Sequence, residues 1–182
     1  KGITLSDDVT KFLNAVPFDA AQVNQDLGIH SAERVGKNYQ ESLQYHSLNV
    51  RQISTSWKGK GLKTVIPEYA TANLDIRLVP EIDGAAQLQK IKEHIVEQGF
   101  YVIDRDPTDD ERHTYRKIVK FTTSNTINAF RTNPDSDFGK KVIASIAEGV
   151  GYEPIAIRMM GGTVPIVPLI NKLNIPTVIV PM

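Results

Sequence analysis

The stretch KTVIPEYATANLDIRLVP, residues 63–80, organises the rest of the sequence. From Thr71 to Leu78 polar and apolar residues alternate strictly, which is typical of a strand with one buried face. Asp75 and Arg77 are two residues apart, so their side chains are neighbours on the polar face. Two interpretations of this face remain open. It is either a solvated sheet surface with a weak ion pair, or a surface on which Arg77 faces a ligand.

The surrounding pattern predicts an α+β lid with a ferredoxin-like sheet. A strand is expected at 48–54, before the organising strand, and further strands at 100–103 and 116–122. A helix capped by Asp83 and closed by Gly99 lies between them. The order strand, strand, helix, strand, strand predicts a four-stranded antiparallel sheet with helices on one face. These helices should cover Leu74, Ile76 and Leu78, and leave the face with Asp75 and Arg77 open.

Helices are expected before this sheet. Ser6 precedes an amphipathic pattern that Pro17 ends, and residues 19–27 are predicted to continue as a second helix before Gly28. Residues 31–44 are polar and ambiguous, and we interpret them as helical. Residues 104–113 are interpreted as a charged loop. The segment WKGKG, residues 57–61, is predicted to form a turn because its glycines are conformationally free, and it lacks the pattern of a phosphate-binding loop.

The pattern changes near residues 124–130, where we place a boundary between a lid at 1–126 and an α/β segment at 127–182. A helix that follows residues 133–136 and carries apolar residues at Phe138, Val142, Ile143, Ile146 and Val150 should end at Gly151. A strand at 154–159, a Gly161-Gly162-Thr163 turn, a helix at 164–173 and a strand after Pro176 follow. Alternating helices and strands predict a parallel sheet. The turn can be a tight connection in which Thr163 caps the helix, or a site where backbone N–H groups bind an anion.

Composition excludes several classes of function. The chain has 182 residues, with 21 Lys and Arg against 21 Asp and Glu, so neither a nucleic-acid partner nor a membrane surface is favoured. No cysteine is present, which rules out disulfides and thiolate metal sites. No apolar run is long enough to span a bilayer. Because the chain begins at Lys1 and stops within a strand pattern, we expect it to be a fragment of a longer protein. The compartment, cytoplasmic or exported, stays open.

The histidines do not indicate a metal site. His30, His46, His94 and His113 show no metal-ligand spacing to one another or to a carboxylate. We therefore expect no metal ligands in this chain, neither tight zinc binding nor hydrolysis by the chain alone, and a contribution limited to substrate handling.

Two segments carry a resemblance to a known family. Residues 63–80 and the segment RMMGGTVPIVPLINKLNIPTVIVP, residues 158–181, resemble dizinc metallopeptidases of the aminoacylase, glutamate carboxypeptidase and carnosine dipeptidase type. The first resembles the lid, or dimerisation, domain, and the second resembles part of the catalytic domain. The resemblance implies a homodimer through the lid and two zinc ions in the full-length enzyme. It also implies hydrolysis of small peptides or N-acyl amino acids.

The resemblance also implies roles for particular residues. Thr64 and Arg77 match lid positions that engage substrate, and Arg77 is the candidate catalytic residue. Gly161, Gly162 and Thr163 are candidates for binding the substrate's carboxylate. The alternative is a non-enzymatic dimerisation or small-ligand-binding module. RNA binding through the open sheet face is disfavoured because that face offers no aromatic residue.

Overall fold

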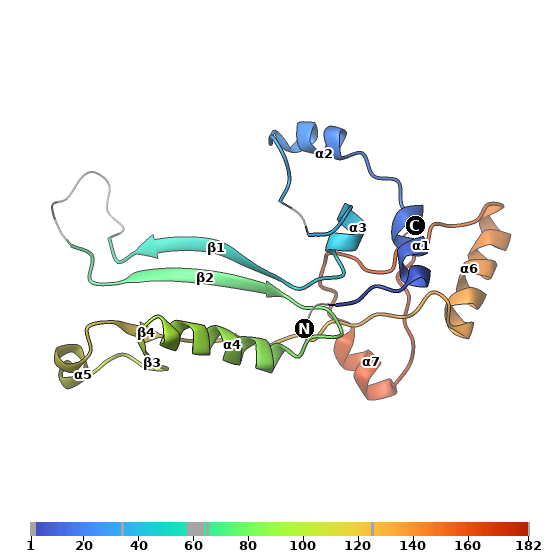
Figure 1. Ribbon diagram of the computed structural model, residues 1–182. Coiled ribbons are helices and arrows are strands. Elements are labelled where there is room, and N and C mark those ends of the chain that lie inside the picture. The colour runs from blue at the N-terminus through green and yellow to red at the C-terminus, as the bar shows by residue number, and fades with distance from the viewer. Residues whose placement is uncertain (1–2, 34, 58–63, 65, 125, 182) are drawn as a thin grey trace.

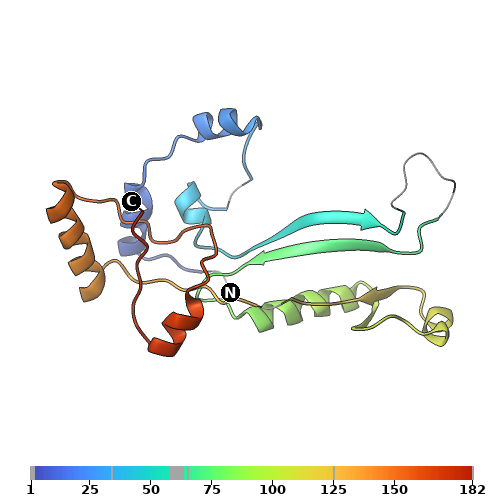
Figure 2. The ribbon, with the colours of Figure 1, turned by 180° about the vertical axis from the view of Figure 1, so that it is seen from behind.

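The computed structural model describes residues 3–33, 35–57, 64, 66–124 and 126–181. The molecule is elongated, with a long two-stranded ribbon and the segment of residues 84–120 beneath it at one end, and helices joined by extended segments at the other (Figures 1 and 2). In chain order the elements are α1 (Asp7–Ala15), α2 (Ala20–Leu27), α3 (Tyr39–Ser42), β1 (Ser47–Thr55), β2 (Ala70–Arg77), α4 (Gly84–Glu97), β3 (Tyr101–Ile103), α5 (Asp109–Thr114), β4 (Ile118–Lys120), α6 (Asp137–Val150) and α7 (Val167–Leu173).

Most predicted helix starts are confirmed because their caps form. Ser6 accepts from the Val9 amide at the start of α1, and Asp19 caps α2. The Asp83 carboxylate accepts from the Ala86 amide at 2.7 Å and begins α4. Ser136 accepts from the Gly139 amide at 3.1 Å and begins α6. Each cap satisfies an amide that has no partner inside its helix.

The ribbon of β1 and β2 is antiparallel and contains one bulge. Leu48 pairs with Ile76 and Val50 with Leu74, but beyond the bulge Ile53 pairs with Ala72. Arg51 is the extra residue between the two registers. The apolar residues of β1 are spaced two and then three apart, and the bulge keeps all of them on the face that carries Leu74 and Ile76.

The expected four-stranded antiparallel sheet is wrong. The described strands form two separate two-stranded sheets, and β3 and β4 pair in parallel. The reason is the connection between them, which contains the helix α5 instead of the expected loop. A connection that contains a helix is long enough to bring the chain back to the start of β3, so that β4 runs in the same direction as β3. The sequence signal for α5 is the capping box of Thr108 and Glu111.

The expected burial of the strand's apolar face holds only in part. Leu74 is 41% exposed and Val50 is 59% exposed, whereas Ile76 and Leu78 are half-buried and Leu78 lies against the start of α4 at Gly84, so this face is covered only near the end of β2. The buried apolar side chains of the described residues are Leu13, Val79 and Val167. They lie in α1, after β2 and at the start of α7, so the small core sits where β2 ends and not along the ribbon.

Two further expectations need correction. In the described part of residues 31–44 the only helix is the short α3, because Gly36 adopts a φ of 82° and interrupts a helical path. In the C-terminal segment α6 and α7 are present, but residues 154–159 and those after Pro176 form no strand within the described chain. A strand is defined by its ladder, and these segments have no ladder partner there.

The predicted turn at 57–61 lies mostly outside the described residues. Within the part of the chain that the structure describes, no helix is long and apolar enough to cross a membrane.

Acidification should loosen α5. Glu111 accepts from both terminal nitrogens of Arg105, at 2.7 and 2.8 Å, and from the Thr108 amide at 2.8 Å. These hydrogen bonds lower the pKa of Glu111 to about 2, and the hydrogen bond with Arg105 has the largest effect. A lowered folded-state pKa gives stability that is present above the unfolded value of 4.5 and is lost as pH falls toward 2. NMR should therefore show the α5 amide signals losing protection across this window. Glu111→Gln should remove the dependence, and a midpoint near 4.5 in the wild type would contradict it.

Candidate functional site

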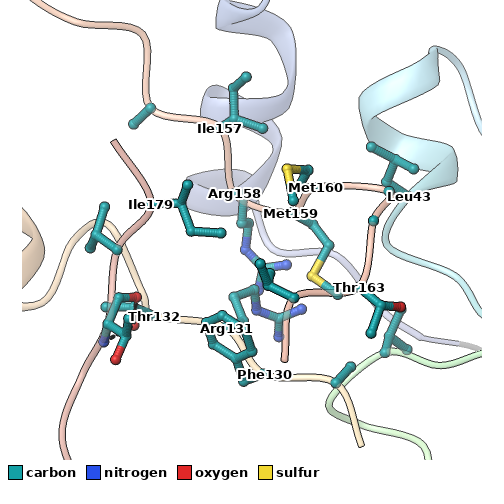
Figure 3. Close-up of a pocket in the computed structure, with 18 of the residues that line it drawn as sticks. Leu43, Phe130, Arg131, Thr132, Ile157, Arg158, Met159, Met160, Thr163 and Ile179 are labelled. Carbon is teal, nitrogen blue, oxygen red and sulfur yellow. Dashed lines mark hydrogen bonds between the residues drawn. The ribbon is translucent and has the colours of Figure 1, made fainter. Parts of the chain in front are cut away.

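A cavity of about 1500 Å³ lies where the ribbon meets the C-terminal half of the chain. Its walls come from the adjoining ends of β1 and β2, from residues 127–134, from α6 and from residues 154–164 and 177–181. Side chains from these separate segments converge in Figure 3, with Arg131 and Arg158 near the centre of the view. The lining is mostly apolar, so each charge in it is felt more strongly than it would be in water.

Arg77 lies at this cavity and makes the predicted pair with Asp75. The Arg77 Nε donates to Asp75 Oδ2 at 2.6 Å, so the carboxylate fixes the plane of the guanidinium. An Arg77 terminal nitrogen also donates to Thr163 Oγ1 at 3.4 Å, across a separation of 86 residues. Two residues singled out from separate motifs therefore meet in space. The Arg77 side chain remains 54% exposed and accessible to a ligand.

The Gly161-Gly162-Thr163 turn has a constrained position. A Cβ atom on Gly161 would lie 3.1 Å from Leu43 Cδ2 and 3.4 Å from the Tyr39 hydroxyl, so this backbone packs closely against α3 and the residue after it. The interpretation of Thr163 as a helix cap is wrong. Helix α7 begins at Val167 without a side-chain cap, and the threonine hydroxyl instead meets Arg77.

Thr64 is not brought into this cluster. It precedes β2, whereas Arg77 ends that strand, and a strand of eight residues separates them. At about 3.3 Å per residue, the strand length exceeds the reach of any side chain. Thr64 is exposed and does not line the cavity.

Two further arginines enter the cavity, and sequence reasoning missed both. Arg131 is only 12% exposed and pairs with Glu81, its Nη1 lying 3.5 Å from Glu81 Oε2. Arg158 donates to Oε1 of Gln44, whose side chain is almost completely buried. A signal for Arg158 is present in the sequence: it is the one charge in the run PIAIRMM, residues 154–160, and a charge in an apolar run is costly unless it is paired or functional.

These groups influence each other's ionisation. Burial lowers the pKa of Arg158, the nearby positive charge of Arg131 lowers it further, and Glu81 partly offsets both. Burial raises the pKa of Glu81, but its hydrogen bonds with Arg131 and with its own backbone, and the charges of Arg131 and Arg158, bring the pKa below its ordinary value. Glu81 is therefore held as a carboxylate by its pair with Arg131, and the charge of Arg158 adds to this effect.

The described residues do not fit a dinuclear zinc site. Nowhere in residues 3–33, 35–57, 64, 66–124 and 126–181 do three histidine, aspartate or glutamate side chains gather as metal ligands. Beside Asp75, this cavity presents the guanidinium groups of Arg77, Arg131 and Arg158, which are suited to binding anions.

Comparisons with known proteins show a similarity to one peptidase family. Residues 11–100 match the sequence model of the peptidase dimerisation domain of the M20 family. These residues are therefore similar in sequence to that dimerisation domain, and the chain is similar in fold to an M20 family metallo-carboxypeptidase. A search of curated protein sequences gave no match.

Solved structures extend the similarity over most of the chain. An M20 family metallo-carboxypeptidase from Sulfolobus solfataricus superposes with a TM-score of 0.68 and 25% identity, over 94% of this chain and 36% of its own. Human carnosine dipeptidase 1 gives 0.62 at 21% identity, and the dipeptidase Dug1p from Saccharomyces cerevisiae gives 0.62 at 17%; each match covers 94% of this chain and 34% of the relative. The last two support the fold alone. The chain spans about a third of the length of these relatives.

Proposed function

We propose that this chain supplies the dimerisation lid and part of the substrate-binding surface of a zinc-dependent exopeptidase or dipeptidase. The intact protein would hydrolyse peptide or amide bonds in small peptides or N-acyl amino acids. The observation that carries the proposal is the contact between Arg77 and Thr163. It joins the lid strand to the glycine turn, the two segments that resemble the same family. Residues 1–126 would form the lid, and residues 127–182 would belong to the catalytic domain.

Each residue has a role set by its chemistry. Arg77, oriented by Asp75, would bind an oxygen of the substrate, either its terminal carboxylate or the oxyanion that develops during hydrolysis. The amides of Gly161 and Gly162 and the Thr163 hydroxyl would bind the same end of the substrate. Thr64, remote from this cluster, would act on the active site of the neighbouring subunit in a homodimer. Two zinc ions would supply the activated water, held by residues other than those described here.

Hydrolysis and assembly can be measured on the same sample. The intact protein is expected to cleave dipeptides or N-acyl amino acids, to lose activity when a chelator removes metal, and to regain it when zinc is restored. It should sediment as a dimer at micromolar concentration. The alternative, a non-enzymatic dimerisation or small-ligand module, predicts a dimer that hydrolyses none of these substrates at any metal concentration. A strictly monomeric, active protein would contradict the assembly but not the chemistry.

A further inference from the structure

The cavity contains a cation, Arg158, that forms no ion pair within the part of the chain that the structure describes. Arg77 is paired with Asp75, and Arg131 is paired with Glu81. No carboxylate of the described residues forms an ion pair with Arg158, whose hydrogen-bonding partner there is the neutral Gln44 side chain. A guanidinium has five N–H donors, so Arg158 keeps most of them available.

The position of Arg158 makes this imbalance costly. The residue is half-buried, and Figure 3 shows it among Ile157, Met159 and Ile179. Removing a charge from water is unfavourable unless an opposite charge compensates it. Glu81 compensates only in part, because Arg131 binds it directly and adds a second positive charge near Arg158. The group formed by Glu81, Arg131 and Arg158 therefore carries a net positive charge beside an open cavity.

Arg158 is also held in place for binding. Gln44 is 1% exposed, and its amide nitrogen donates to the Gln40 carbonyl at 3.0 Å, which fixes its oxygen toward Arg158. A guanidinium that is already oriented loses little conformational freedom when it binds a planar anion. A carboxylate matches its paired donors better than a spherical ion does.

We propose that Arg158, with Arg131 behind it, binds a carboxylate in this cavity at a second anion position, separate from Arg77 and Thr163. The carboxylate comes from a small molecule or from an acidic side chain of a peptide. Both present the same planar group to the guanidinium. The inference does not depend on peptidase activity, because it concerns binding by the 182-residue chain itself.

Titration by NMR tests the proposal. The signal of the Arg158 Nε–H group is followed while N-acetylglycine, or a peptide blocked at both ends and containing one glutamate, is added. Saturable shifts of Arg158 and of the Met159 amide are expected, and the shifts should weaken as chloride is raised. N-acetylglycine binding alone identifies a free small carboxylate as the source, and binding of the blocked peptide alone identifies an acidic side chain. An absence of saturable shifts with both ligands overturns the proposal.

Two variants and a control sharpen the test. Arg158→Gln should weaken binding, read from the Met159 amide, by about tenfold or more, because a charge-assisted hydrogen bond is lost. Glu81→Gln should instead tighten binding by a factor of about 2–5, because the remaining negative charge is removed. A folding defect would not produce this opposite sign. Arg116→Gln, an exposed arginine outside the cavity, should leave binding unchanged. Equal affinity in the Arg158→Gln and Glu81→Gln variants would refute the site.

Discussion

Replacing Arg77 with alanine is expected to lower kcat of the intact protein by roughly 10²–10³-fold if its guanidinium stabilises the transition state. That is the scale of losing one donor to a developing oxyanion. If Arg77 holds only the ground-state carboxylate, KM should rise while kcat changes little. Steady-state kinetics on a dipeptide and on an N-acyl amino acid separate the two outcomes. Both expected outcomes rest on the geometry of Arg77, which forms a 2.6 Å hydrogen bond with Asp75 and contacts Thr163 at the cavity.

Two further variants test this interpretation of Arg77. Arg77→Lys should rescue poorly, because an ammonium group cannot reproduce a bidentate contact with a carboxylate or keep the same geometry with Asp75. Arg51→Ala, at an exposed position of the neighbouring strand that does not line the cavity, should keep normal kinetics. A folded, dimeric Arg77→Ala protein with normal kcat and KM would return Arg77 to the role of a solvated surface residue.

Gly139→Ala should destabilise the chain by about 1–3 kcal/mol, although alanine is the better helix former by about 1 kcal/mol. A Cβ atom at this position would lie 2.5 Å from the Pro134 carbonyl oxygen and 2.7 Å from that of Asn133. Both neighbours are backbone atoms, so the clash is relieved only if the segment that begins α6 moves. The free energy of unfolding, measured in urea, should therefore fall.

A second glycine in the same helix provides the matched control. Gly149 has no atom within 4 Å of the position its Cβ would take, so Gly149→Ala should raise the free energy of unfolding by about 0.5–1 kcal/mol through helix propensity alone. The two substitutions are chemically identical and lie in one helix. Shifts of the same sign would show that contact with residues 133–134 does not set the requirement for glycine.

Strong local signals in the sequence predicted the local structure. The caps at Ser6 and Asp83 and the alternation in β2 act between residues close in sequence, and these elements formed where expected. The association of strands was predicted wrongly, because alternation identifies a strand but does not specify its partner. The parallel pairing of β3 and β4 depends on α5, whose capping box was overlooked.

The candidate site could likewise be predicted from the sequence only where its contacts are local. The pair of Asp75 and Arg77 follows from strand geometry and could be predicted from spacing. The meeting of Arg77 with Thr163, and of Arg158 with Gln44, joins residues 86 and 114 positions apart, and no local pattern specifies such contacts. Arg131 and Arg158 could have been suspected from their apolar neighbours, but their shared relation to Glu81 required the structure.

Because of the bulge at Arg51, β1 should tolerate the gain or loss of a residue at this position better than elsewhere in the strand. Deleting Arg51 would bring Ile53 two places after Val50, so the ladder becomes regular while Leu48, Val50 and Ile53 keep their face. Deleting a residue elsewhere in the strand, such as Asn49, would move Leu48 to the polar face unless a new irregularity formed. Insertions and deletions among relatives of this lid should therefore accumulate at the position of Arg51, where a residue can be gained or lost without inverting the ribbon.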